Sequence, residues 1–196
     1  MSAPAFFATS VDEVKVWMQE EGTSDSINER LLQLIRAVTT SIEERLSLRI
    51  EQITRTELPF VRKNDLAIDL LARPVLRIDE VRTAWDRDFT TDSSILDAAV
   101  YYLDPEAGQM ILDARWEWEK EGTLQVTYKG GLATSLENLK ADHPKIVQAA
   151  NMWVGDWYDR GARITSRTRG SDGDVASMIP KAVEQLLGPG PISMRV

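Results

Sequence analysis

The sequence predicts an α+β protein, in which a helical bundle of about four helices carries an inserted middle segment rich in β-hairpins. Near both ends of the 196-residue chain, apolar residues recur at intervals of three and four, as one face of a helix requires. Between residues 53 and 131, proline and glycine separate short stretches rich in Val, Ile, Thr, Tyr and Trp, which is typical of strands. We therefore expect a single domain over residues 1–187 and an extended C-terminal tail over residues 188–196.

The first two helices are predicted from their starting motifs. Segments 10–13 and 26–29 both have the Ser-x-x-Glu form of a capping box, in which each side chain bonds a free backbone N–H of the first turn. They predict helices over about 11–20 and about 27–48, and the second would be roughly 33 Å long. Its apolar face forms the spine of the predicted domain and consists of Ile27, Leu31, Leu34, Ile35, Val38, Ile42 and Leu46.

The middle segment is expected to contain several strands and at least one tight turn. Leu124, Val126 and Tyr128 alternate with polar residues, which predicts one buried and one solvated face. Segment 104–108 has the composition of a turn. Strands are predicted over 66–70, 75–85, 99–103 and 124–128.

Two prolines mark the starts of the remaining helices, because proline is well tolerated at the first helical position. Pro144 predicts a helix over about 144–160 that ends near Gly161. A mobile loop is expected over 161–177, and Pro180 then opens a short helix over 180–187.

Composition excludes several kinds of site. The chain has no cysteine, which removes disulfides and thiolate chemistry, and its one histidine, His143, cannot alone build a catalytic triad or a multi-histidine metal centre. No phosphate-binding glycine loop is present, and Asp172 and Asp174 lack the later ligands of a calcium loop. We predict a protein without catalytic residues, metal or cofactor, and His143 is expected to cap a helix or lie at the surface.

Charge is unevenly placed along the chain. The formal net charge is -8, which disfavours tight nonspecific binding of nucleic acid, and neither a secretory signal nor a membrane span is expected. The one basic cluster has two open interpretations: a solvated loop, or a patch that meets an acidic neighbouring subunit or a DNA backbone. It consists of Arg160, Arg163, Arg167 and Arg169.

Five short motifs lie along the chain in a characteristic order. They are VDEVK-x-W at 11–17, VTYKGG at 126–131, P-x-x-V-x-x-A at 144–150, WYDR at 157–160 and IP-x-AV-x-x-LL at 179–187. In this order they resemble the head–tail connector (adaptor) family of tailed bacteriophages, which prophages and gene transfer agents also carry.

The resemblance implies a virion neck protein that is assembled in the bacterial cytoplasm. About twelve copies would form a ring under the portal vertex, with DNA passing through it, and a stopper or tail-terminator protein would bind the other side. Twelve chains at -8 give a ring charge of about -100, which lets DNA slide without specific binding. We expect the arginine cluster to lie at a seam between subunits or on the channel wall.

Within this resemblance, we expect the segment from Pro180 to Val196 to dock into the portal protein, because it offers apolar side chains with little else to cover them. These side chains belong to Pro180, Val183, Leu186, Leu187, Ile192 and Met194.

An alternative from another class is a small β-rich module that binds or hydrolyses carbohydrate. Trp116 and Trp118 would lie on one face of a strand, and with Trp85 they could form a stacking platform. Packing of the same indoles in the core explains the pattern equally well.

Overall fold

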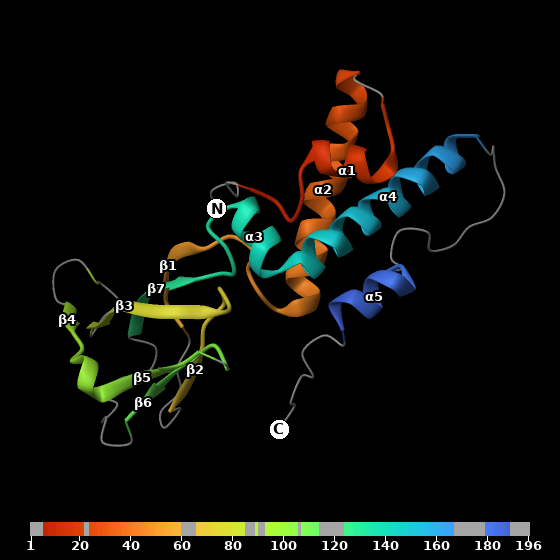
Figure 1. Cartoon of the computed structure of the whole chain (residues 1–196). Helices are drawn as coiled ribbons and strands as arrows, with labels where there is room; N and C mark the ends of the chain where they lie inside the picture. Colours follow the sequence, from red (N-terminus) through yellow and green to blue (C-terminus); the bar gives the residue numbers. More distant parts are fainter. Residues whose placement is uncertain are drawn as a thin grey trace. The chain divides into compact units, whose positions relative to one another are not determined.

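A computed structural model describes residues 6–21, 24–59, 66–84, 89, 93–105, 107–113, 124–166 and 179–188, with the side chains of 93–94 and 161–166 excepted. The chain divides into two compact units. The helical unit comprises Met1–Glu51 and Ala133–Val196, and the β unit comprises Gln52–Leu132. The α+β class is confirmed, since the described residues form five α-helices and two antiparallel sheets (Figure 1).

In the helical unit, α4 is the central element and contacts each of the other four helices. The helices are α1 (Val11–Met18), α2 (Asp25–Leu46), α3 (Leu136–Asp142), α4 (Pro144–Ser166) and α5 (Lys181–Leu187). Four residues of the predicted spine of α2 are buried at intervals of four, three and four, and each is 1% exposed or less: Leu31, Ile35, Val38 and Ile42. Ile27, Leu34 and Leu46 are partly buried. Apolar burial along this face is what holds the unit together.

Only one of the two predicted capping boxes acts as a cap. The Ser10 hydroxyl accepts a hydrogen bond from the Glu13 N–H at 3.3 Å, as predicted for the start of α1. The second box is wrong, because α2 begins at Asp25 and Ser26 lies inside its first turn. The backbone carbonyl of Ser24 accepts from the N–H groups of Ile27 and Asn28, so the helix starts before the predicted motif.

The region around α3 and α4 departs from the prediction in two places. Helix α3 was not predicted; Ser135 caps its start and His143 its end, the boundary role expected for that histidine. Helix α4 begins at Pro144 as predicted, but it continues to Ser166, so residues 161–166 are helical where a loop was expected. One glycine in a helix costs only about 1 kcal/mol relative to alanine, and Gly161 therefore does not end α4.

The β unit contains seven described strands. They are β1 (Ile53–Glu57), β2 (Ala67–Asp69), β3 (Val75–Ala84), β4 (Ser93–Ile95), β5 (Tyr101–Asp104), β6 (Gln109–Leu112) and β7 (Leu124–Gly130). One sheet has the order β1-β7-β3-β4 and the other the order β2-β6-β5, and all pairs are antiparallel. The predicted alternation in β7 is confirmed, since Leu124, Val126 and Tyr128 are fully buried.

Two details of the β5–β6 region follow from local chemistry. The predicted turn at 104–108 connects β5 to β6: the Asp104 carboxylate accepts from the Ala107 N–H at 3.0 Å, and Gly108 has a φ of +65°. The strand predicted from residue 99 starts later, because Ala98–Val100 form a short 3₁₀ helix capped by the Asp97 side chain.

A buried tyrosine of β7 links β1 to the segment that connects β2 with β3. The Tyr128 hydroxyl donates to the Glu57 carboxylate at 2.6 Å and accepts from the Ala72 N–H at 2.8 Å. The Arg55 guanidinium pairs with the same carboxylate at 2.6 Å. Burial, followed by the hydrogen bond to Glu57, raises the pKa of Tyr128 above its ordinary value of 10.0.

No helix in the described part of the chain is long and apolar enough to span a bilayer.

Candidate protein–protein interface

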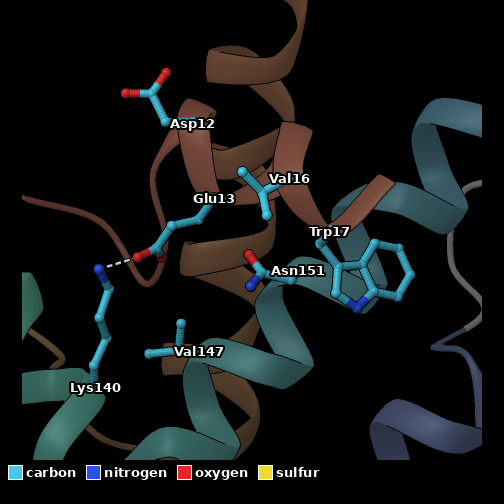
Figure 2. A pocket seen from close by; sticks show the side chains of 7 residues that line it. All are labelled: Asp12, Glu13, Val16, Trp17, Lys140, Val147 and Asn151. Atoms are coloured by element: carbon cyan, nitrogen blue, oxygen red, sulfur yellow. Dashed lines mark ion pairs between the residues drawn. The ribbon is translucent and has the colours of Figure 1, made fainter. Parts of the chain in front are cut away.

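The helical unit has an open groove of about 450 Å³ where α1 meets α3 and α4 (Figure 2). One side comes from α1 and the other from α3 and α4. The lining residues are Asp12, Glu13, Val16, Trp17, Lys140, Val147 and Asn151. We name this set the α1 groove.

Two large apolar side chains of the α1 groove face solvent. Helix α1 packs inward through Val14, which is completely buried, whereas Val16 lies roughly 200° round the helix from it and points outward. Val16 is 80% exposed and Trp17 is 47% exposed. Adjacent exposed apolar residues beside a hollow are typical of a surface that another protein covers, and tryptophan is favoured at the centres of such interfaces.

The Trp17 indole lies against α4 at Gly155. A Cβ atom at position 155 would overlap Cζ3 of this indole, so the glycine provides the space in which the ring lies. One part of the Trp17 indole therefore packs on α4, and the other part is exposed to solvent. This support restricts the rotamers of Trp17, which lowers the entropy that a partner must remove on binding.

A polar network fixes the other end of the groove. The Lys140 ammonium pairs with the Glu13 carboxylate (Figure 2). This carboxylate also accepts a hydrogen bond from the Thr9 hydroxyl at 3.1 Å. Thr9 is nearly buried and lies 2.5 Å from the Asn151 side-chain amide. The Thr9 hydroxyl has one hydrogen, and both of its partners are acceptors, the Glu13 carboxylate and the Asn151 side-chain carbonyl oxygen, so the two acceptors share it. The hydrogen bond that Lys140 donates to Glu13 raises the pKa of Lys140. The network connects α1 to α3 and α4.

This arrangement supports binding through apolar contact and charge. Glu13 is occupied by its ion pair, and Asp12 is exposed at the mouth of the groove. Among the described residues, no three His, Cys, Asp or Glu side chains are grouped so that they could hold a metal ion. The groove is therefore best interpreted as a docking surface with an apolar floor and an acidic rim.

Comparison with known proteins identifies the fold. No family model and no curated protein matches the sequence. Solved structures match over nearly the whole chain. A chain from the neck of an empty gene transfer agent (GTA) particle, computed with C6 symmetry, has a TM-score of 0.63 and 17% identity, covering 95% of this chain and 91% of the other. The chain has the fold of a GTA neck protein.

Two further structures agree with this. A chain from the neck of a native GTA particle, computed with C12 symmetry, has a TM-score of 0.57 and 14% identity over 88% of this chain and 86% of that one. A chain from the virion of a native GTA particle has a TM-score of 0.60 and 18% identity over 95% and 91%. The predicted resemblance to connector proteins is confirmed at the level of the fold.

Within this neck-protein fold, the residues predicted to bind portal have different environments. Val183 is completely buried, so it fixes α5 to the helical unit and is not available at the surface. Pro180, Leu186 and Leu187 are half-buried, whereas Ile192 and Met194 lie outside the described residues. The ion pair of Arg45 with Glu184, at 3.8 Å, also connects α5 to α2.

The arginine cluster is only partly described. Arg160 pairs with Asp156 one turn earlier in α4, at 2.8 Å, and Arg163 lies in the last turns of the same helix. Arg167 and Arg169 lie outside the described residues. So do the three tryptophans of the carbohydrate alternative, Trp85, Trp116 and Trp118.

The α1 groove itself was not predicted from sequence. A usable signal was present in α1, because Val16 is two residues from Val14 and so points to the opposite side of the helix. Trp17, three residues from Val14, lies at the flank of the buried face. The contributions of Lys140 and Asn151 come from helices more than a hundred residues away, so only the fold brings them to this site.

Proposed function

We propose that this chain is a structural neck protein that forms a ring of about twelve copies under the portal vertex of a tailed phage or related particle. The observation that carries this proposal is the fold likeness over 95% of the chain to a protein from a GTA particle neck. The C6 and C12 symmetries of those particle necks support a cyclic arrangement of identical subunits.

In this proposal, the chain acts through surfaces and not through catalysis. Residues 1–187 act as one connector domain, a helical bundle with a hairpin-rich insertion, and residues 188–196 act as an extended tail. The exposed pair Val16 and Trp17 gives the ring an apolar contact. The net charge of -8 per chain supports a channel through which DNA passes without being held.

The two sides of the ring would bind different neighbours. Helix α5 and the tail would dock into the portal protein, with Pro180, Leu186 and Leu187 beside Ile192 and Met194 as the apolar contacts and Val183 holding the helix in place. The opposite side would bind a stopper or tail-terminator protein. The arginine cluster would lie at a subunit seam or on the channel wall. Assembly would take place in the bacterial cytoplasm, and the final location would be the virion neck.

Electron microscopy of the purified chain mixed with the portal protein tests this function. We expect rings of about twelve subunits stacked on the portal. A chain that stays a single particle in the presence of portal, under conditions in which both proteins are folded, would contradict the proposal.

Deletion of residues 188–196 tests the portal contact separately. The truncated chain should keep its far-ultraviolet circular dichroism and its unfolding midpoint, because the buried Val183 and the Arg45–Glu184 ion pair that hold α5 lie outside the deleted segment. Its binding to portal should be lost, and normal binding would refute this assignment of the tail. Replacement of Arg163, Arg167 and Arg169 by serine should impair ring assembly or DNA retention; unchanged assembly and retention would remove the arginine cluster from both places.

A further inference from the structure

A ring built from head-to-tail contacts requires two different surfaces on each chain: a receiving surface, and a received surface that binds the receiving surface of the next copy. The assignment of these two surfaces rests on the proposed ring. The α1 groove is the receiving candidate, since it is hollow, has an apolar floor and keeps Val16 at 80% exposure. The received surface should then be convex and of opposite charge.

Charge along the sequence favours one candidate for the received surface. Residues 11–29 contain six carboxylates and one basic residue, Lys15, so the sequence of α1 and the start of α2 is acidic, although Glu13 is paired with Lys140. In contrast, the sequence from Arg160 to Gly170 contains four arginines and no acidic residue. Its first part is the C-terminal end of α4, which includes Arg160 and Arg163.

The same chain cannot place this end of α4 in its own groove. Asn151 and Val147 line the groove from α4 itself, and Arg163 lies twelve residues beyond Asn151 on that helix. At 1.5 Å per residue, this separation is about 18 Å along a rigid element. Any contact between the α1 groove and the arginine end of α4 must therefore join two molecules.

The chemistry of the two surfaces is complementary. An arginine guanidinium stacks well on a tryptophan face and pairs with a carboxylate at the same time. The groove offers a half-exposed indole at Trp17 and an exposed carboxylate at Asp12.

We infer that the α1 groove receives the arginine-rich end of α4 from the neighbouring copy of this chain, and that this contact is a seam of the ring. Asp12 and Trp17 of one copy would hold arginines of the next copy, and the pattern would repeat around the ring until it closes.

Exchange of the two charges tests the inference. Asp12→Arg and Arg163→Asp each place like charges at every seam, and we expect each variant alone to require a protein concentration about tenfold or more higher for assembly with portal. An equimolar mixture restores opposite charges at both kinds of seam in an alternating ring, so we expect assembly at the wild-type concentration. Glu29→Arg is the matched control, because it reverses an exposed carboxylate on α2 that does not line the groove, and it should assemble normally.

The outcomes separate this inference from the proposed function. If wild type forms rings and both single variants form them equally well, the seam assignment is wrong while the ring stands. If the double variant in one chain assembles but the mixture of single variants does not, the contact lies within one chain and the inference is overturned. If wild type forms no ring with portal, the proposed function fails and the inference fails with it. Val16→Arg, at a position 80% exposed, provides a variant that cannot disturb the core and should also block assembly.

Discussion

Replacement of Tyr128 by phenylalanine should destabilise the β unit without changing its shape. The ring of Tyr128 is completely buried and remains in the variant, so apolar packing is retained. The variant loses one hydrogen bond from the Ala72 N–H at 2.8 Å and one to the Glu57 carboxylate at 2.6 Å. Glu57 keeps its ion pair with Arg55 at 2.6 Å, which limits the loss on that side.

The magnitude follows from these two bonds. A neutral hydrogen bond contributes about 0.5–1.5 kcal/mol and one to a charged group about 1.5–3 kcal/mol, and a buried N–H left without a partner adds a desolvation cost. We expect the free energy of unfolding to fall by about 2–3 kcal/mol. Urea denaturation followed by circular dichroism measures this change. Tyr102→Phe is the control, because Tyr102 is 59% exposed, and it should stay within about 0.5 kcal/mol of wild type. A similarly small effect of Tyr128→Phe would refute the proposed linking role of the hydroxyl.

Three further outcomes are expected. The pKa of Tyr128 in the folded chain is raised above 10.0, so its stabilising contribution is complete below about pH 10 and is lost as pH rises toward the folded value. Urea midpoints measured between pH 8 and about 11.5 should therefore fall more steeply for wild type than for Tyr128→Phe. Parallel curves would contradict this. Gly130→Ala should lower the free energy of unfolding by about 3 kcal/mol or more, since the new Cβ overlaps the backbone carbonyl of Ala72. Soluble yield and thermal unfolding measure this loss. Wild-type stability of the variant would show that the backbones at Gly130 and Ala72 are less close. Gly155→Ala should stabilise the chain by about 1 kcal/mol only in a Trp17→Ala background, and an equal gain with the indole present would show that Trp17 does not lie against α4.

Periodicity in the sequence predicted the elements whose faces are long and regular. Helix α2 extends over Asp25–Leu46 and its apolar face is buried, and β7 alternates as its sequence indicates. The turn at Asp104 was predictable because its carboxylate and Gly108 act locally. In such elements the information lies within a few residues of where it acts, so local chemistry is sufficient.

Features that depend on distant parts of the chain were not predictable in this way. Helix α3 is only seven residues long, too short to show a periodic pattern, and it is stabilised by packing on α4. Glycine often marks a helix end, but Gly161 does not end α4. The α1 groove joins residue 13 to residue 140, and burial of Val183 depends on where α5 packs. The proposed function rests on the resemblance to connector proteins, because no local motif carries a chemistry of its own.

Native mass spectrometry of the wild-type chain mixed with portal protein tests the central claim most directly, because it counts subunits. The account predicts one dominant complex that carries about twelve copies of this 22.1 kDa chain, or about 265 kDa, on each portal assembly. A spectrum that contains only free portal and single chains, at concentrations where both are folded, would contradict it.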